Sequence, residues 1–151
     1  MRCLEESLLA REAGDAALQA QIDTLQTQVD GLLAPVVHAV GDTLLDGGIV
    51  FWVDDSGEHG LAAWPSDDAS GNWYQANHDA DAHGPGWRLP AKHELNLLYL
   101  QKDVVGGIGD NGYWSSAEFD SESAWFQNFG NGSQDIRIKS NPISVRAVRA
   151  F

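Results

Sequence analysis

Near the N-terminus, nine positions recur at alternating spacings of four and three residues without a break. They are Leu4, Leu8, Arg11, Asp15, Leu18, Ile22, Leu25, Val29 and Leu32. A seam that repeats every seven residues predicts a helix over residues 4–33 that forms a left-handed coiled coil. Gly31 and Pro35 are expected to end this helix, because glycine favours a C-terminal cap and proline cannot continue a helix.

The composition of the seam bears on how the helix associates. It is apolar from Leu18 to Leu32, whereas Arg11 and Asp15 interrupt it closer to the N-terminus. Polar seam residues lower stability but fix register and strand number. The apolar stripe is narrow and its flanks are polar, which favours association between chains; an amphipathic helix folded back on its own domain is the alternative. In the heptad, Leu8, Asp15, Ile22 and Val29 occupy position a, and Leu4, Arg11, Leu18, Leu25 and Leu32 occupy position d. β-branched residues at position a together with leucine at position d favour a dimeric coiled coil.

Charge is unevenly distributed along the 151 residues. The chain holds 9 Lys and Arg against 22 Asp and Glu, a net charge of −13, and residues 12–87 contain no Lys or Arg at all. A protein without a basic footprint is a poor partner for nucleic acid or an anionic membrane surface. No apolar run approaches the roughly 18–20 residues of a membrane span, and residues 1–14 do not resemble a signal peptide.

After residue 36 the pattern becomes strand-like. The apolar run 47–53, the turn 54–57 and the segment 59–64 predict a hairpin, and helical spacing is found in 91–101. Short strands are expected at 112–116, 124–129, 135–139 and 145–151, with residues 65–86 forming a loop or a short helix. We therefore expect an α+β domain over residues 36–151, after an oligomerisation helix over residues 1–34.

Five motifs of this domain occur in the order of a known family. They are GGIVFWVDDSGEHGL, GWRLPAKHELNLLY, YWSSAE, AWFQNF and VRAVRAF. In this order the set resembles the Lcl C-terminal domain family, whose members are C-type-lectin-like domains at the ends of bacterial collagen-like and other surface proteins. The resemblance implies a C-type-lectin-like fold, commonly displayed as a trimer on a stalk. It therefore favours a homotrimer through residues 4–33.

The C-terminal stretch AWFQNFGNGSQDIRIKSNPISVRAVRAF has a second resemblance. It is similar to the C-termini of proteins diversified by retroelements, in which a fixed frame is interrupted by slots of freely mutated residues. The resemblance implies a variable region of about 119–144. Its slots, and the candidate ligand-binding residues, are Phe119, Asp120, Glu122, Ser123, Phe126, Gly130, Ser133, Asp135, Ile136, Arg137, Ile138, Ser140, Asn141, Pro142 and Ile143.

Codon chemistry gives modest support to that interpretation. Random change of both adenines of an AAC codon cannot produce Met, Trp, Gln, Lys or Glu, and every slot except Glu122 holds an allowed residue. An ordinary family member with varied loop side chains is the alternative. On either interpretation the frame residues must hold the core, and we expect this of Trp114, Trp125, Phe129, Val145 and Val148. The slot residues, such as Phe126 and Ile138, would then face a ligand.

We find no enzyme motif and expect no cofactor and no metal. Cys3 lies in the helix without a nearby His, so it is inert or forms a bridge between chains. The stretch from His78 to His83 lacks a tetrahedral zinc spacing, and a solvated loop explains it better. Asp54, Asp55 and Glu58 resemble no EF-hand, and turn chemistry accounts for them.

Three functions fit these patterns. The first is a non-enzymatic recognition head, trimeric on a coiled coil, whose hypervariable face binds a cell-surface protein or glycan. The second is a glycan-binding adhesin head of the collagen-like type, and the third is a structural trimerisation cap. We expect the protein outside the cytoplasm, on a bacterial surface or on a phage virion such as its tail.

Overall fold

The computed structural model describes residues 2–151. They form two compact units, which divide between Val36 and Val37. The first unit is the helix α1 (Arg2–Leu32), none of whose residues is buried. No helix within residues 2–151 has both the length and the apolar character needed to cross a membrane.

The second unit, residues 37–151, is an α+β head. Along the chain it forms β1 (Ile49–Val53), β2 (Gly60–Ala63), β3 (Asp68–Gly71), α2 (Trp73–Asp81), α3 (Lys92–Leu100), α4 (Lys102–Val105), β4 (Gly112–Glu118), β5 (Ser123–Asn128), β6 (Gln134–Ile138), β7 (Ile143–Val145) and β8 (Val148–Ala150). The expected hairpin and the helix in 91–101 are confirmed. The segment predicted as one last strand is two, β7 and β8, and they join different sheets.

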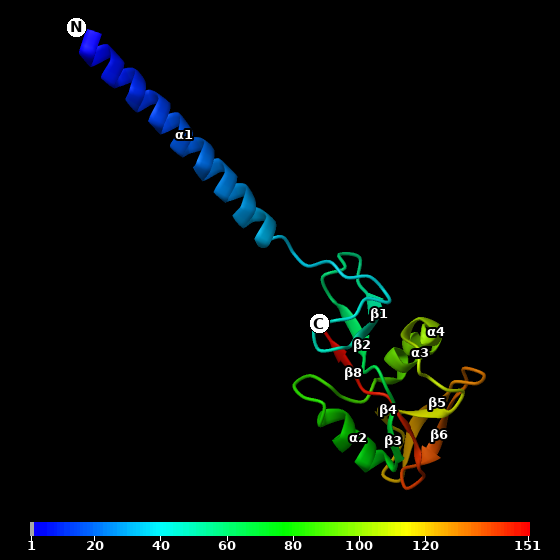
Figure 1. Cartoon of the computed structure of the whole chain (residues 1–151). Helices are drawn as coiled ribbons and strands as arrows, with labels where there is room; N and C mark the ends of the chain where they lie inside the picture. Colours follow the sequence, from blue (N-terminus) through cyan, green and yellow to red (C-terminus); the bar gives the residue numbers. More distant parts are fainter. Residues whose placement is uncertain (1) are drawn as a thin grey trace. The chain divides into compact units, whose positions relative to one another are not determined.

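The head contains two sheets, with strand orders β1-β2-β8 and β3-β7-β4-β5-β6 (Figure 1). In the larger sheet all pairs are antiparallel except β4 with β7, which run parallel. Strand β6 lies at one edge of this sheet and bonds to β5 only. The variable region, residues 119–144, therefore contains the edge strand β6, its neighbour β5 and the first residues of the inner strand β7.

Two clusters of apolar side chains pack against opposite faces of the larger sheet. Successive residues of a strand point to opposite faces, and Trp114 belongs to one cluster while Tyr113 belongs to the other. On the Trp114 face lie Ala76 and Ala80 of α2, and on the Tyr113 face lie residues of α3 and β1. Figure 1 shows α2 and α3 on different sides of β4 and β5. Both faces of the inner strands are therefore covered.

The expected core residues are nearly all in place. Trp114, Phe129, Val145 and Val148 are fully buried, which confirms four of the five. The fifth, Trp125, is only half-buried. The next residue, Phe126, points to the opposite face of β5 and is buried in the core. The two residues have thus exchanged their expected roles, which bears on the candidate site.

Candidate functional site

The fifteen slot positions lie mostly at the surface. The side chains of eleven are exposed, those of three are half-buried, and one is buried. The exposed ones are Phe119, Asp120, Glu122, Gly130, Ser133, Asp135, Arg137, Ile138, Ser140, Asn141 and Pro142; the half-buried ones are Ser123, Ile136 and Ile143. Most of the variable region therefore faces away from the core of the head.

Phe126 is the exception and corrects our expectation that it faces a ligand. Its side chain is only 8% exposed and belongs to the cluster that includes Trp114. The middle of β5 is covered on both faces, so alternation along the strand did not reveal which side chains are free. Part of the Phe126 ring still borders a surface cleft.

Two frame glutamines support the variable hairpin from inside. Gln127 is fully buried, and its Nε2 donates to Asn96 Oδ1 at 2.9 Å and to the carbonyl oxygen of Gly132 at 3.0 Å. Gln134 Nε2 donates to Gln127 Oε1 at 3.2 Å and to the carbonyl oxygen of Lys92 at 2.8 Å. A buried side-chain amide destabilises the fold unless its polar atoms are hydrogen-bonded. The turn between β5 and β6 is thus fixed by residues that are not slots.

A frame lysine fixes the other end of the hairpin. Lys139 Nζ donates to Glu118 Oε2 and also to the carbonyl oxygens of Asp120 and Ser121. Its backbone N–H donates to the carbonyl oxygen of Glu122 at 2.8 Å. These bonds hold the turn between β4 and β5, in which three slots lie, against the end of β6.

The arginine that follows β7, Arg146, is fully buried and bonded throughout. It pairs with Asp67 at 2.6 Å and donates to the carbonyl oxygen of Trp64 at 2.9 Å and to that of Gly107. Asp67 also accepts a hydrogen bond from the Tyr113 hydroxyl at 2.7 Å. Burial, followed by this contact with Asp67, raises the pKa of Tyr113 to about 12. The network connects β7 and β4 to the loop before β3.

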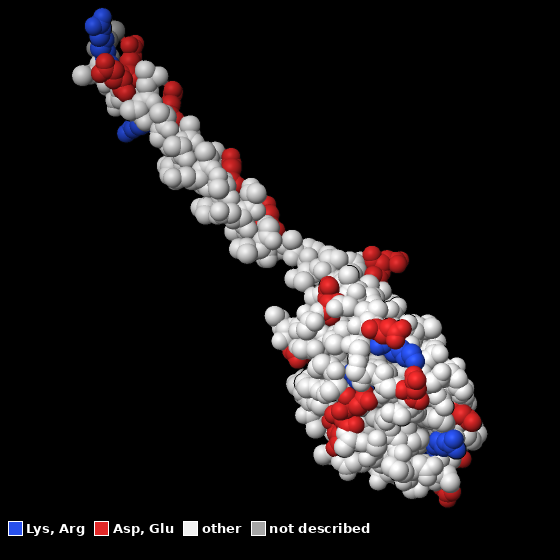
Figure 2. All heavy atoms as spheres, turned by 45° about the vertical axis from the view of Figure 1, so that its right-hand side comes forward, with Lys and Arg blue, Asp and Glu red and all other residues white. Residues whose placement is uncertain are grey.

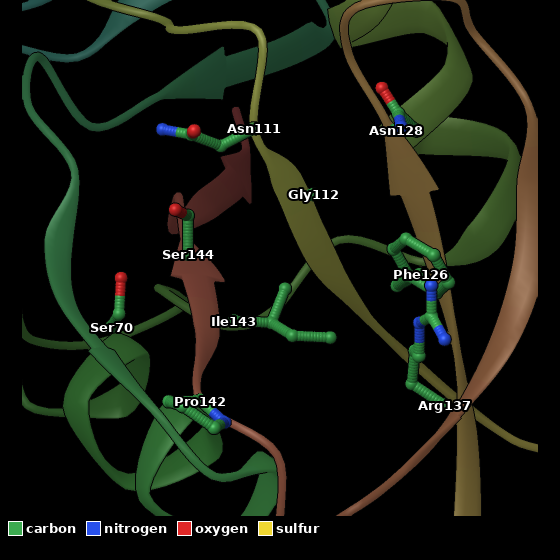
Figure 3. Close-up of a pocket in the computed structure, with 9 residues that line it drawn as sticks. All are labelled: Ser70, Asn111, Gly112, Phe126, Asn128, Arg137, Pro142, Ile143 and Ser144. Atoms are coloured by element: carbon green, nitrogen blue, oxygen red, sulfur yellow. The ribbon is translucent and has the colours of Figure 1, made fainter.

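A cleft of about 420 Å³ opens on the larger sheet, and residues of all five of its strands line it (Figure 3). Four slots line it together with five other residues. The slots are Phe126, Arg137, Pro142 and Ile143, and the others are Ser70, Asn111, Gly112, Asn128 and Ser144. The five others were not among our candidates. Ser70 and Asn111 come from distant segments of the chain, so only the fold brings them to the slots.

In Figure 3 the walls of the cleft differ in character. Asn111, Ser144 and Ser70 lie along one side, and Arg137 extends towards the Phe126 ring on the other. The guanidinium carbon of Arg137 is 5.2 Å from the centroid of that ring. Gly112 lies between these two sides and forms the floor of the cleft. A Cβ atom built at this position would lie 2.9 Å from Phe126 Cδ2 and would crowd the ring. The absence of a side chain at position 112 therefore keeps the cleft open.

On the opposite face of β6, apolar slots are exposed or half-buried. Ile136 and Ile138 stand opposite Trp125 and Ser123 in the register of β5 and β6, so they share that face. Phe119 contacts Trp125 edge to face, with 6.0 Å between the ring centroids. Phe119 is 56% exposed and Ile138 is 58% exposed. We call Phe119, Trp125, Ile136 and Ile138 the aromatic patch.

Positive charge in the head is largely neutralised. Of the seven Lys and Arg in residues 37–151, five pair with a carboxylate, and the two that do not are Lys92 and Arg137. Lys92 lies over Trp125, with Nζ 3.3 Å from the ring centroid. Figure 2 shows a face of the head on which red acidic atoms outnumber blue basic ones. The two unpaired cations therefore stand out, and they lie over adjacent aromatic residues of β5.

The residues set aside in the sequence have structural partners. His83 stacks on Trp64 at 4.0 Å between ring centroids, and its Nε2 lies 2.8 Å from Asp68 Oδ1. Asp54 Oδ1 accepts hydrogen bonds from Ser56 and Gly57, as expected of a turn residue. Within residues 2–151, no group of three or more His, Cys, Asp or Glu is placed to hold a metal ion. Cys3 is exposed and free on α1.

Comparison with known proteins agrees with the family expectation. No curated protein matches the chain. Among solved structures, a chain from the complex of a mutant von Willebrand factor A1 domain with botrocetin is similar with a TM-score of 0.45 and 15% identity, over 73% of this chain and 100% of that one. The profile of the Lcl C-terminal domain matches residues 48–149. The chain therefore belongs to the Lcl C-terminal domain family.

Proposed function

We propose that this protein is a non-enzymatic recognition module whose C-type-lectin-like head binds a ligand through its variable region. One observation carries the proposal: eleven of the fifteen slots are exposed, while the frame residues between them hold the fold. Gln127, Lys139 and Arg146 are buried and bonded to several partners each. The exposed slot residues are thus free to change without loss of the head.

This division is the physical requirement for diversification by a retroelement. Substitutions at exposed positions away from structural contacts usually alter stability by less than about 0.5 kcal/mol. A retroelement that rewrites the slots would therefore generate folded variants with different surfaces. The aromatic patch and the cleft are the two surfaces that such rewriting would change most, since slots contribute to both.

The stalk in this proposal is a homotrimeric coiled coil of α1. All seven apolar seam residues are exposed in the single chain, from 45% for Val29 to 85% for Leu32. Leucine and isoleucine side chains at such spacing are stabilised by burial against other helices, at about 25 cal/mol per Å². A trimer would present three heads, and repeating a weak site raises avidity when ligand sites match the spacing.

The glycan-binding adhesin head remains the second candidate, supported by family membership and by the polar cleft. We further propose that the protein acts outside the cell, on a bacterial surface or a phage virion, because recognition of a cell-surface ligand requires display there. A structural cap without a ligand is the third candidate and predicts that no slot affects any binding.

Sequencing this gene from several isolates tests the proposal. Differences should concentrate at the fifteen slots within residues 119–143, and a template repeat beside a reverse-transcriptase gene should carry adenine-rich codons at the same positions. Residues 36–112 serve as the internal control. If residues 119–143 vary no more than this control segment, diversification is wrong. Light scattering should return three times the 16.4 kDa chain mass, and a monomer would exclude the stalk.

A further inference from the structure

The cleft beside β6 contains a guanidinium group that lacks a carboxylate partner. Arg88, Arg146 and Arg149, the other arginines of the head, each pair with an acidic side chain. Arg137 is exposed and instead lies over the Phe126 ring at 5.2 Å. Stacking on an aromatic ring pre-organises the planar donors of arginine. The group is therefore held in place with its hydrogen-bond donors available.

Neutral polar groups line the same cleft as this cation. Asn128 Oδ1 accepts from the backbone N–H of Gly130 at 2.8 Å, which orients the side chain and leaves its NH₂ group free to donate. Asn111, Ser70 and Ser144 line that cleft too, and within residues 2–151 their side chains make no hydrogen bonds. Carboxylates accept hydrogen bonds from guanidinium, amide and hydroxyl donors alike. The donor set thus matches one carboxylate.

Electrostatics limit how much negative charge the ligand can bring. The head is acidic overall, so a long polyanion would be repelled along most of its length. A single carboxylate is different, because at physiological ionic strength charges beyond about 8 Å are largely screened. Asp135 is an acidic slot on the same face of β6, two residues from Arg137, and within residues 2–151 no ion pair joins the two. A volume of about 420 Å³ accommodates one side chain together with part of its backbone.

The surroundings of the cleft favour a protein as the source of that carboxylate. The aromatic patch lies on the other face of the same edge strand, with Phe119 and Ile138 more than half exposed. Protein interfaces combine exposed aromatic and aliphatic anchors with arginine, whereas charged residues other than arginine are depleted at their centres. A ligand that wraps β6 would contact both surfaces together.

We propose that the cleft binds one Asp or Glu side chain of a protein ligand, with Arg137 as its ion-pair partner. The proposal rests on the ligand-binding function proposed above and assigns the chemistry of one contact. Asn111 and Asn128 donate to the same carboxylate or to the adjacent peptide group. If the slots are diversified, the residue at position 137 would determine which ligand charge the cleft prefers, while Asn111 and Asn128 would stay constant.

The test is NMR titration of the full chain, ¹⁵N-labelled, with N-acetyl-glutamate N-methylamide as the probe. The side-chain NH₂ signals of Asn111 and Asn128 and the backbone signal of Gly112 should shift in a saturable manner. The matched glutamine probe, which lacks the charge, should bind about tenfold more weakly, as expected when one charged hydrogen-bonded pair is lost. Glucuronate serves as the saccharide probe and should bind more weakly than the glutamate probe.

Variants of the arginine complete the test. R137A should weaken binding of the glutamate probe about tenfold and R137K should recover part of it, because lysine cannot form the bidentate contact. R2A removes the same charge from α1 outside the seam and should leave the affinity unchanged. Absence of saturable shifts at the cleft, equal binding of the glutamine probe, or tighter binding of glucuronate overturns the proposal. None of these results bears on slot variation between isolates, so the two proposals fail separately.

Discussion

Lys139 Nζ lies 2.6 Å from Glu118 Oε2, although the lysine side chain is 4% exposed and the glutamate side chain 56% exposed. The same ammonium group donates to the carbonyl oxygens of Asp120 and Ser121 at 3.0 and 3.1 Å. Its three donors are therefore all used. One frame residue joins the end of β6 to the turn after β4, and the slots of that turn take their positions from it.

The first prediction concerns this lysine. Lys139→Met keeps most of the side-chain volume but leaves three acceptors without their donor, so it should lower the free energy of unfolding by about 1–3 kcal/mol. The exposure of Glu118 limits the loss, since water can replace the lysine there. Urea denaturation of the two proteins measures the difference. Lys92→Met is the control, because Lys92 has no ion pair, and an equal effect of both variants would contradict the prediction.

The second prediction separates slot from frame. Ser140→Ala and Asn141→Ala alter exposed slots whose side chains make no hydrogen bonds within residues 2–151, and each should change the free energy of unfolding by less than about 0.5 kcal/mol. Gln127→Ala removes a buried amide that bonds to Asn96, Gly132 and Gln134. It should cost about 1–3 kcal/mol. Thermal denaturation compares the stability of the three variants. If the slot variants lose as much stability as Gln127→Ala, the proposed division into slot and frame residues is wrong.

Local patterns were sufficient to predict the long helix, the first hairpin and the α+β class. Heptad spacing and alternation are properties of consecutive residues, and the segments at 49–53 and 92–100 follow them closely. β3 has no such pattern, because Asp68–Gly71 is polar and none of its residues is buried. It becomes a strand only by pairing with β7, a partner more than 70 residues away in sequence.

The candidate site was predicted unevenly for the same reason. Fixed and variable positions alternate along one stretch of chain, so the exposed slots could be identified from that stretch alone. The exchange of Phe126 and Trp125 could not, since it depends on tertiary packing: Phe126 joins the cluster that includes Trp114, whereas Trp125, on the other face of β5, is only half-buried. Ser70 and Asn111 enter the cleft from segments without any binding motif, and only tertiary structure reveals them.

A third prediction addresses the stalk. Replacing Leu18 and Leu25 by glutamate places charges in the apolar part of the seam, where burial between helices would require their desolvation. On the proposed trimeric stalk, the double variant should be a monomer by light scattering at concentrations at which the parent protein associates. Gln19→Glu with Gln26→Glu adds the same charge outside the seam and should leave the trimer intact. An unchanged mass for the leucine variant would show that α1 does not hold the chains together.

The fourth prediction concerns the floor of the cleft. Gly112→Ala would bring a methyl group to 2.9 Å from Phe126 Cδ2, and the buried ring cannot yield without disturbing the core. Overpacking of this kind typically costs about 1–3 kcal/mol. Gly14→Ala is the control, since nothing lies within 4 Å of its added Cβ. Calorimetry should show a lower midpoint for Gly112→Ala only, and equal midpoints would mean that the floor tolerates a side chain.

The last prediction uses the pKa of Tyr113, which burial and the contact with Asp67 raise from 10.0 to about 12. A raised pKa means that the folded state keeps the proton more tightly than the unfolded state. The stabilisation is therefore complete below pH 10 and is lost as the pH rises from 10 to about 12. Tyr113→Phe cannot ionise, so its free energy of unfolding should decline less over this interval. Urea denaturation at pH 9, 10.5 and 11.5 measures the free energy of unfolding of both proteins.

A second group titrates in the same interval, because Asp110 raises the pKa of Lys102, but this contribution is common to both proteins and cancels in the difference. Parallel curves for the two proteins would contradict the assignment, because the difference between them isolates the Tyr113 hydroxyl.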